Sequence, residues 1–447
     1  MLVAGCGLEP LQEVEIPVCT AGAFLDCEDT HAVFCNGHGD GAVIMECGSV
    51  GCNMAEGRCN VCVADQSVCV ADAVQTCGSD GTTSTSDPCP LGCSEDPEPH
   101  CRVIVPSYAG LADACDPAPA STRLEVAVRA TLEVDTGDDV QCTGGIVAQV
   151  SGPQICVVRA GSITIAEHGT LVARGPRALA LIADRDLAIT GTLDVSADGV
   201  VDGPGGGGSV SGGSAGIDGG GGAGGKHAGA AGGTAIANGG AANGGAVVAD
   251  PADLVSLAGG ARVNDPRGGG GGGAVLLIAC HGQLSVGGAG MIDAGGGGGD
   301  GGLDSIAGPG TAFVAGAGGG AGGYIVLEAV SIVIDNNVRI LAHGGAGGGG
   351  TSIDDQAGAR GDDASHSFFI TAHGGIAAGE GGTGGNGGHH GLPENFPQPT
   401  IGRAPVGLGS PGGGGGSIGF LQAYLPEDAA GFPGMGPFEP RRTLLTR

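Results

Sequence analysis

The stretch Gly268–Gly299, GGGGGGAVLLIACHGQLSVGGAGMIDAGGGGG, places a strand-like aliphatic segment between two runs of polyglycine. Glycine loses more conformational freedom on folding than any other residue, so its abundance beside a core-forming segment calls for a structural explanation. Short apolar runs bounded by glycine are typical of buried β-strands. The stretch therefore predicts strands that belong to a core, and glycine-rich segments that leave this core and return to it.

Two consecutive segments upstream give the period of the strands. Each has three pairs of apolar residues: Ile155 and Val157, Ile163 and Ile165, Leu171 and Ala173 in the first, and Leu179 and Leu181, Leu187 and Ile189, Leu193 and Val195 in the second. Equivalent positions are 22 to 24 residues apart, and three short strands in about 23 residues is the period of a parallel β-helix. We therefore predict an all-β protein whose main domain, residues 120–430, is a right-handed parallel β-helix that begins near residues 124–134.

The same coil recurs further along the chain. Leu181-Ile182-Ala183 is matched by Leu277-Ile278-Ala279, Leu327-Glu328-Ala329 and Leu421-Gln422-Ala423. Because the middle residue varies in polarity, we expect it to face outward while the flanking residues face the core. The third strands are expected at Leu193-Asp194-Val195, Met291-Ile292-Asp293 and Val338-Arg339-Ile340. In this alignment no two acidic residues lie together on the same face of the strands of the coils.

Glycine-rich excursions separate the coils, at roughly residues 200–273, 295–323 and 343–416. Each begins after a third strand, so all leave from the same corner of the helix. They are either flexible linkers or extended, polyglycine-II-like helices packed side by side, since backbones without side chains can approach closely. Their common corner and the near-equal length of two of them favour packing. In composition they resemble the glycine-rich tips of some phage adhesins and the glycine-rich surface proteins of mycobacteria.

Cysteines define two further modules, residues 19–60 and 61–102, which together hold twelve of the chain's 17 cysteines. The two sets have similar spacing: Cys19, Cys27, Cys35, Cys47, Cys52 and Cys59, then Cys62, Cys69, Cys77, Cys89, Cys93 and Cys101. A unit of about 40 residues buries too little surface to fold unaided, so we predict three disulfides in each. Six cysteines allow fifteen pairings, and the connectivity stays open.

Other cysteines have separate roles. Cys59-Asn60-Val61-Cys62 is a CxxC, but no partner CxxC or paired histidine follows it, which favours disulfides over a metal site. We expect Cys142 to pair with Cys156, and Cys280 to be a free buried thiol.

The module spacing resembles that of tandem cysteine-rich repeats in secreted lipoproteins of myxobacteria, and this resemblance implies a surface location. Val3-Ala4-Gly5-Cys6 resembles a bacterial lipobox, which implies that Cys6 carries lipid and that the chain is attached to outer-membrane lipid. Residues 1–18 are then a signal remnant and linker. The charged and apolar regions of a signal peptide are missing, so either translation starts further upstream or the match arises by chance.

Charge restricts the partners. The formal net charge is −30 and Lys226 is the single lysine. Binding to nucleic acid requires clustered Lys and Arg, so nucleic acid is excluded as a partner. The density of cysteines indicates an oxidising, extracytoplasmic compartment, and we predict an outer-membrane or cell-surface location.

One excursion contains possible metal ligands. Carboxylates and a histidine at Asp354, Asp355, Asp362, Asp363 and His366 are a candidate calcium site. The alternative is a solvated polar loop. No other cofactor is expected.

Residues 103–119 form a linker and residues 431–447 a C-terminal tail. We predict a structural, adhesive or display role toward an unknown surface or matrix ligand, without catalysis, and no catalytic residue is assigned. The alternative is an extracellular polysaccharide lyase or hydrolase on the β-helix scaffold. Lys226 and Arg360 lie in glycine loops, and the chain has few aromatic residues for sugar platforms, which favours the non-catalytic role.

Overall fold

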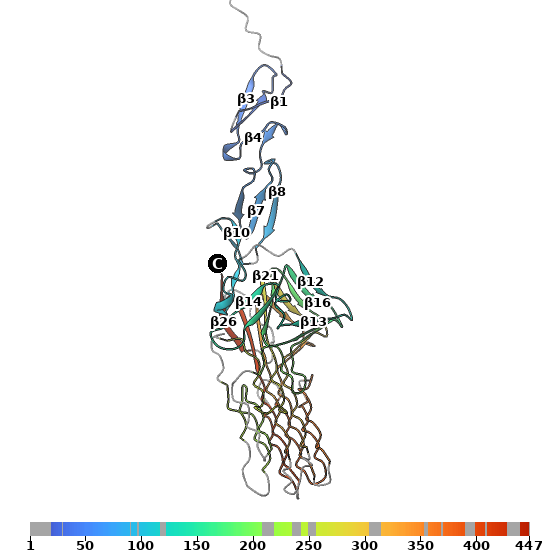
Figure 1. Ribbon diagram of the computed structural model, residues 1–447. Helices are drawn as coiled ribbons and strands as arrows, with labels where there is room; N and C mark the ends of the chain where they lie inside the picture. The colour runs from blue at the N-terminus through green and yellow to red at the C-terminus, as the bar shows by residue number, and fades with distance from the viewer. Residues whose placement is uncertain are drawn as a thin grey trace, which may run out of the picture. The chain divides into compact units, whose positions relative to one another are not determined.

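The computed structural model describes residues 19–28, 30–89, 91–95, 98–116, 122–207, 219–234, 243–248, 256–303, 314–352, 356–367, 370–388, 398–406, 409–426 and 439–446. The chain divides into two compact units, Met1–Arg102 and Val103–Arg447, and Figure 1 colours the chain from blue at its N-terminus to red at its C-terminus. The protein is all-β apart from two short 3-10 turns in these residues, Gly48–Val50 and Ala109–Leu111. Within the same residues no helix is long and apolar enough to cross a membrane.

The first unit consists of two similar disulfide-rich modules. Each has a three-stranded antiparallel sheet and a two-stranded one. The strands of the first module are β1 (Phe24–Glu28), β2 (His31–Cys35), β3 (Ala42–Glu46), β4 (Cys52–Asn53) and β5 (Arg58–Cys59). Those of the second are β6 (Ser67–Val70), β7 (Ala73–Cys77), β8 (Ser84–Pro88), β9 (Cys93–Ser94) and β10 (His100–Cys101).

The two modules share one disulfide connectivity, in which the first cysteine pairs with the third, the second with the fifth and the fourth with the sixth. The bonds are Cys19–Cys35, Cys27–Cys52 and Cys47–Cys59, then Cys62–Cys77, Cys69–Cys93 and Cys89–Cys101. The CxxC at the junction is therefore divided between two modules. The modules also contact each other, because Asn53 Nδ2 donates to the Asp80 carbonyl oxygen at 2.8 Å and the Val61 N–H donates to the Gly81 carbonyl oxygen at 2.8 Å.

The second unit contains a large, curled sheet rich in parallel pairs and a five-stranded parallel sheet. The large sheet has the order β11-β26-β25-β23-β21-β18-β15-β14, with β12, β16 and β19 joined to it through β21. Its strands are β11 (Ile104–Val105), β12 (Arg123–Val126), β14 (Gly145–Val147), β15 (Ile155–Ala160), β16 (Ser162–Ile165), β18 (Ala178–Ala183), β19 (Leu187–Ile189), β21 (Ala274–Val286), β23 (Tyr324–Ile334), β25 (Phe420–Pro426) and β26 (Glu439–Thr446). The five-stranded sheet has the order β13 (Thr131–Asp135), β17 (Thr170–Arg174), β20 (Thr192–Asp194), β22 (Met291–Asp293) and β24 (Arg339–Leu341).

Aliphatic residues from successive strands lie in register and form one core. Leu181 on β18 pairs with Leu277 on β21, which in turn pairs with Leu327 on β23. These leucines are fully buried, in one cluster with inward-facing residues of the five-stranded sheet such as Leu193 and Ile292. Branched and small apolar side chains stack along the strands, and this explains how a chain without tryptophan fills its core.

Three details of the expected alignment are wrong. In the fourth triplet, Ala423 rather than Leu421 pairs with Leu327, a shift of two residues. In the five-stranded sheet, Leu193 pairs with Ile292, and Ile292 with Ile340. The expected third strand at Met291 is shifted by one residue, because Met291 and Ile292 are both apolar and either could face the core. The expected third strand at Val338 is shifted by two residues.

The middle residues of the triplets point away from the core but are not exposed to solvent. Ile182, Ile278 and Glu328 are each 0% exposed, and Gln422 is 1% exposed. A segment of the predicted linker, residues 103–119, covers part of this outer face, because Ser107 bonds to Glu328 and Cys115 forms a disulfide with Cys280. The prediction of a free thiol at Cys280 is therefore wrong. Cys142 and Cys156 form the eighth disulfide among the described residues, and these bonds suggest an oxidising, extracytoplasmic location.

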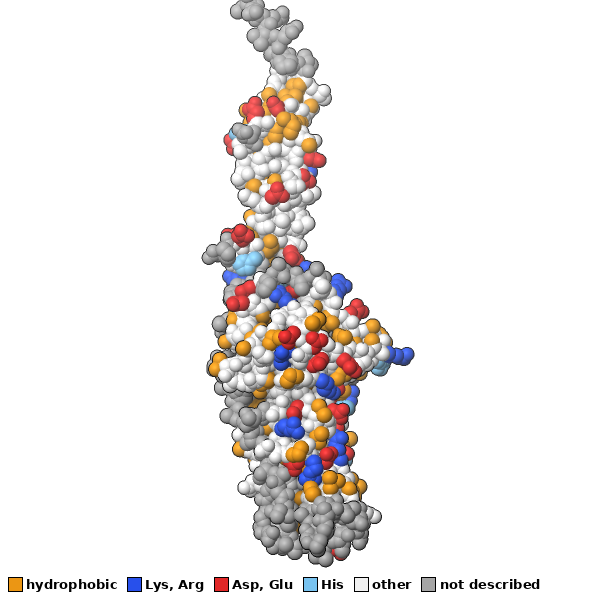
Figure 2. Space-filling model, viewed as in Figure 1, with side chains coloured by type: hydrophobic (Ala, Val, Ile, Leu, Met, Phe, Trp, Pro, Cys, Tyr) orange, Lys and Arg blue, Asp and Glu red, His pale blue; other side chains and the backbone are white. Residues whose placement is uncertain are grey.

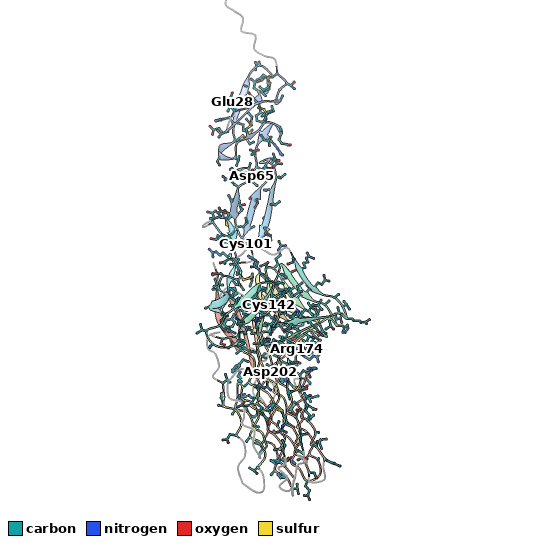
Figure 3. All side chains as sticks on the ribbon, in the orientation of Figure 1. Glu28, Asp65, Cys101, Cys142, Arg174 and Asp202 are labelled. Carbon is teal, nitrogen blue, oxygen red and sulfur yellow. A yellow bond between two sulfur atoms is a disulfide. The ribbon has the colours of Figure 1, made fainter. Side chains whose placement is uncertain are left out.

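The connections from β20 to β21, from β22 to β23 and from β24 to β25 contain the glycine-rich segments. We call the described residues within 199–273, 294–323 and 342–419 the glycine-rich bundle. Its segments run side by side beyond the sheets (Figure 1), and Arg174 and Asp202 lie near the boundary between sheets and bundle (Figure 3). The segments contact one another through their backbones, because a Cβ added to Gly320 would collide with the carbonyl oxygen of Gly270.

Hydrogen bonds in the bundle follow a period of three residues. In the segment 316–323, N–H groups donate to three neighbouring segments, two of which are reached at every third residue and the third through the Ala321 N–H to the Ala261 carbonyl oxygen, while carbonyl groups accept from three other segments. The N–H groups of Gly316, Gly319 and Gly322 donate to Pro411, Gly414 and Ser417, and those of Ala317, Gly320 and Gly323 donate to Asp300, Gly297 and Ala294. Each face of this segment therefore has a partner segment of its own.

Candidate functional site

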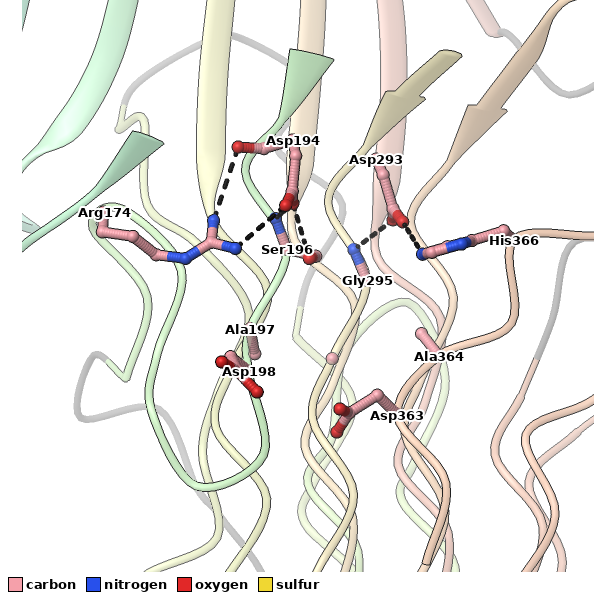
Figure 4. Close-up of a pocket in the computed structure, with 11 residues that line it drawn as sticks. Arg174, Asp194, Ser196, Ala197, Asp198, Asp293, Gly295, Asp363, Ala364 and His366 are labelled. Carbon is pink, nitrogen blue, oxygen red and sulfur yellow. Dashed lines mark hydrogen bonds and ion pairs between the residues drawn. The ribbon is translucent and has the colours of Figure 1, made fainter. Parts of the chain in front are cut away.

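A cavity of about 340 Å³ lies where the five-stranded sheet joins the glycine-rich bundle. Figure 4 shows its lining, which is mostly polar. The residues are Arg174, Asp194, Ser196, Ala197, Asp198, Asp293, Gly295, Gly296, Asp363, Ala364 and His366. The lining comes from the ends of β17, β20 and β22 and from the segment that follows β24.

The strand register brings two carboxylates together. Asp194 and Asp293 end β20 and β22 and are paired residues of neighbouring parallel strands. The flanking strands carry Val172 and Leu341 at the same position. Side chains alternate along a strand, so the inward placement of Leu193 and Ile292 turns both aspartates away from the core. The sequence alignment missed this acidic pair because its error of one residue placed Asp194 opposite Ile292.

Asp194 is bound within its own part of the cavity. Arg174 Nη2 donates to its Oδ2 at 2.9 Å, and Ser196 donates to its Oδ1 through the backbone N–H at 2.9 Å and through Oγ at 2.6 Å. The Arg174 guanidinium also donates to the Ala173 carbonyl oxygen at 2.8 Å. These bonds fix the chain as it turns from β20 toward the bundle.

Asp293 is more deeply buried and makes a different set of bonds. Asp293 is 2% exposed. Its Oδ1 accepts a hydrogen bond from the Gly295 N–H at 2.9 Å, and its Oδ2 lies 2.9 Å from His366 Nε2. The hydrogen bond to Asp293 raises the pKa of His366, with further contributions from the charges of Asp293 and Asp194, while burial and Arg339 act against the shift. His366 therefore stays protonated, and paired with Asp293, up to a higher pH than that at which a free histidine loses its proton.

Asp363 connects separate segments of the bundle. Its Oδ1 accepts the Gly298 N–H at 2.7 Å and the Gly199 N–H at 3.2 Å, and it also pairs with Arg360. Asp198, in contrast, is exposed at the cavity. Three of the four aspartates in the lining are therefore held by N–H donors of the protein.

The candidate calcium ligands do not form one cluster in the part of the chain that the structure describes. Asp363 and His366 line the cavity, whereas the Asp362 carboxylate accepts the His373 N–H at 3.3 Å. Asp354 and Asp355 lie outside the described residues, as does Cys6, the predicted lipidation site. No group of three or more His, Cys, Asp or Glu side chains in the described ranges is arranged to hold a metal ion.

Charged side chains of both signs are interspersed on the visible face of the second unit (Figure 2). Ion pairs in the second unit include Arg262 with Asp202 at 3.2 Å and Arg267 with Asp265 at 3.3 Å. All four residues lie in the first glycine-rich connection, between β20 and β21.

Comparison of the chain with known protein families, with curated proteins and with solved structures finds no match.

Proposed function

We propose that this protein is a surface-exposed structural and display protein, whose second unit is a right-handed parallel β-helix carrying a polyglycine-II-like bundle. The main support for this proposal is the close backbone contact between the glycine-rich segments. A polyglycine-II-like chain has three residues per turn and no internal hydrogen bonds, and the three-residue period of bonds around the segment 316–323 fits this conformation. A chain bonded on every side in this way is a stiff element.

The composition of the bundle supports display rather than catalysis. Its interior is backbone, with a small apolar cluster formed by Ala223, Ala261, Val263 and Ala321. Acid–base and nucleophilic catalysis require positioned side chains, and such a packing leaves no space for them between the segments. The outer residues of the bundle are then the part available to a surface or matrix ligand.

Anchoring at the outer membrane through lipid on Cys6 belongs to the same proposal. The disulfides of the described residues support an extracytoplasmic location, and the lipobox-like residues Val3-Ala4-Gly5-Cys6 support the anchor. The experiment is antibody labelling of intact cells that express the full chain or its Cys6→Ser variant, together with mass spectrometry of the native N-terminus. The proposal expects labelled cells and an acylated Cys6, with the variant released into the medium. Labelling that requires permeabilised cells would contradict surface display.

A second candidate is hydrolysis or elimination on an extracellular polysaccharide, because two aspartates, an arginine and a histidine converge at the cavity. Glycosidases act through a pair of carboxyl groups, and Asp194 and Asp293 lie side by side. The assay is the release of reducing ends or unsaturated sugars from acidic and neutral polysaccharides. Turnover that is abolished in Asp194→Asn and Asp293→Asn, but kept in Asp335→Asn on the exposed side of the sheets, would replace the display proposal with an enzyme.

A further inference from the structure

Residues 103–115, which we call the strap, cross the outer face of the large sheet. At the start of the strap, Ile104 and Val105 of β11 pair with β26. Ser107 then reaches β23, and Cys115 is joined to Cys280 on β21. Since the sheet order is β26-β25-β23-β21 and strands lie about 4.8 Å apart, these three contacts follow the strap across successive strands.

The middle of the strap rests on an ionisable side chain. Glu328 is 0% exposed, and it lies in a lateral row between Ile278 on β21 and Tyr424 on β25. The Ser107 N–H donates to Glu328 Oε2 at 3.0 Å, and Ser107 Oγ contacts Oε1. Ile104, before Ser107, is 0% exposed, and Tyr108 and Leu111, after it, are each 5% exposed, so the strap is buried on both sides of this contact.

Burial raises the pKa of Glu328 to about 7, although the two hydrogen bonds from Ser107 act to lower it. Among the described residues, no neighbouring charge contributes to this shift in the pKa of Glu328. Arg159 lies in the same row across the sheet, but Ile182 and Ile278 separate it from Glu328, and it forms an ion pair with Asp184. Burial raises the pKa of the Tyr108 hydroxyl in the strap. A negative charge on Glu328 would therefore be poorly solvated beneath a closed strap.

We propose that the strap is a pH-operated flap, which lies closed on the sheet while Glu328 is neutral and lifts between Val105 and Cys115 when Glu328 ionises. The Cys115–Cys280 disulfide and the β11–β26 pair hold its two ends. Lifting gives water access to the carboxylate and to the row formed by Ile278, Glu328 and Tyr424. The flap responds to the pH of the extracytoplasmic medium and requires no ligand.

The sign and size of the effect follow from linkage. Glu328 has a pKa of about 7 in the closed state, whereas a solvated glutamate has a pKa of 4.5. The ratio of open to closed strap therefore rises about tenfold per pH unit between these values and levels off above them, a total of about 300-fold.

Hydrogen exchange of the full-length, oxidised protein tests the flap. The Ser107 amide is followed between pH 4.5 and 8.5, and its rate is divided by the intrinsic rate at each pH to give a protection factor. The protection factor should fall by up to about 300-fold as the pH rises, while in Glu328→Gln it should not depend on pH. Glu133 on β13 is exposed, so Glu133→Gln is a matched control and should behave as the wild type.

Tyrosine provides a second readout that does not depend on a folded variant. The chain has three tyrosines and no tryptophan, and Tyr108, Tyr324 and Tyr424 are each at most 5% exposed. Tyr108 belongs to the strap, and the other two lie on the strands of the outer face. Quenching of wild-type tyrosine fluorescence by acrylamide should increase as the strap opens. A pH-independent protection factor in the wild type, or an equal pH dependence in Glu328→Gln, would overturn the proposal.

Discussion

His366 Nε2 lies 2.9 Å from Asp293 Oδ2, and this contact joins a glycine-rich segment to the last residue of β22. The carboxylate is almost fully buried, whereas the histidine side chain is 62% exposed. The sheet thus supplies a buried carboxyl group, and the bundle supplies the histidine that pairs with it.

Replacing His366 with Asn should reduce stability in a pH-dependent way. The folded-state pKa of His366 is raised above 6.5, so its stabilising contribution is fully present below about pH 6.5 and is lost as the pH rises through the folded-state value. For a half-exposed ion pair the difference should be up to about 1 kcal/mol. Denaturant unfolding of wild type and variant at pH 5.5 and pH 8.5 measures it. His373→Asn, at an exposed position, is the control, and a difference of equal size at both pH values would contradict the ion pair.

Gly320→Ala should destabilise the second unit by about 2 kcal/mol or more, because the new methyl group would overlap the carbonyl oxygen of Gly270 in a neighbouring segment and backbone has to shift. Gly388→Ala is the control within the same bundle, since the atom nearest to its added Cβ, the Ile418 nitrogen, is 3.3 Å away. Because this contact is still tight, Gly388→Ala should also cost stability, but clearly less than Gly320→Ala. Chemical denaturation measures both variants, and an equal loss would show that close backbone contact is not what stabilises the bundle.

Arg159→Met should lower the free energy of unfolding by about 3 to 5 kcal/mol. Arg159 Nε donates to Asp184 Oδ1 at 2.9 Å, and the Asp184 side chain is 0% exposed, so the variant leaves a buried carboxylate without this cation. The double variant Arg159→Met, Asp184→Asn removes the charge and should recover part of the loss. Arg123→Met at an exposed position of β12 should have little effect. No recovery in the double variant would argue against a charge effect.

Removing Cys27–Cys52 or Cys69–Cys93 should have similar effects, because the two bonds occupy the same place in the two modules. Paired Cys→Ser substitutions should each cost about 2 to 5 kcal/mol and should loosen the module that carries them. Hydrogen exchange over residues 19–60 and 61–102 measures the loss separately in each module. Peptide mapping of the native chain should recover both cross-links, and any other pairing of these cysteines would refute the shared connectivity.

Local patterns in the sequence are sufficient to predict the strands and the positions of the glycine-rich connections. Ile163 and Ile165, for example, alternate as the residues of a strand with one buried face do, and they lie on β16. The boundaries of the connections follow nearly as directly, because glycine begins at Gly199, shortly after β20, and at Gly295, shortly after β22.

Long-range relationships are not encoded in such local patterns. Cys115 and Cys280 are 165 residues apart, and nothing near either residue indicates the other. The outward orientation of Ile182 and Ile278 follows from the triplet pattern, but whether a face is covered depends on a distant segment. The Asp194–Asp293 pair depends on a register that Met291 and Ile292 leave ambiguous by one residue, so the cavity could not be predicted from the sequence.

The close packing of the bundle also limits which mutations its glycine residues can tolerate. Almost every single change at the first or second base of a glycine codon gives a codon for a bulkier residue, and at Gly297, Gly320 or Gly323 the added Cβ would meet a neighbouring backbone oxygen. Selection should therefore remove most missense changes from the interior of the bundle, and sequence variation should accumulate at its outer residues.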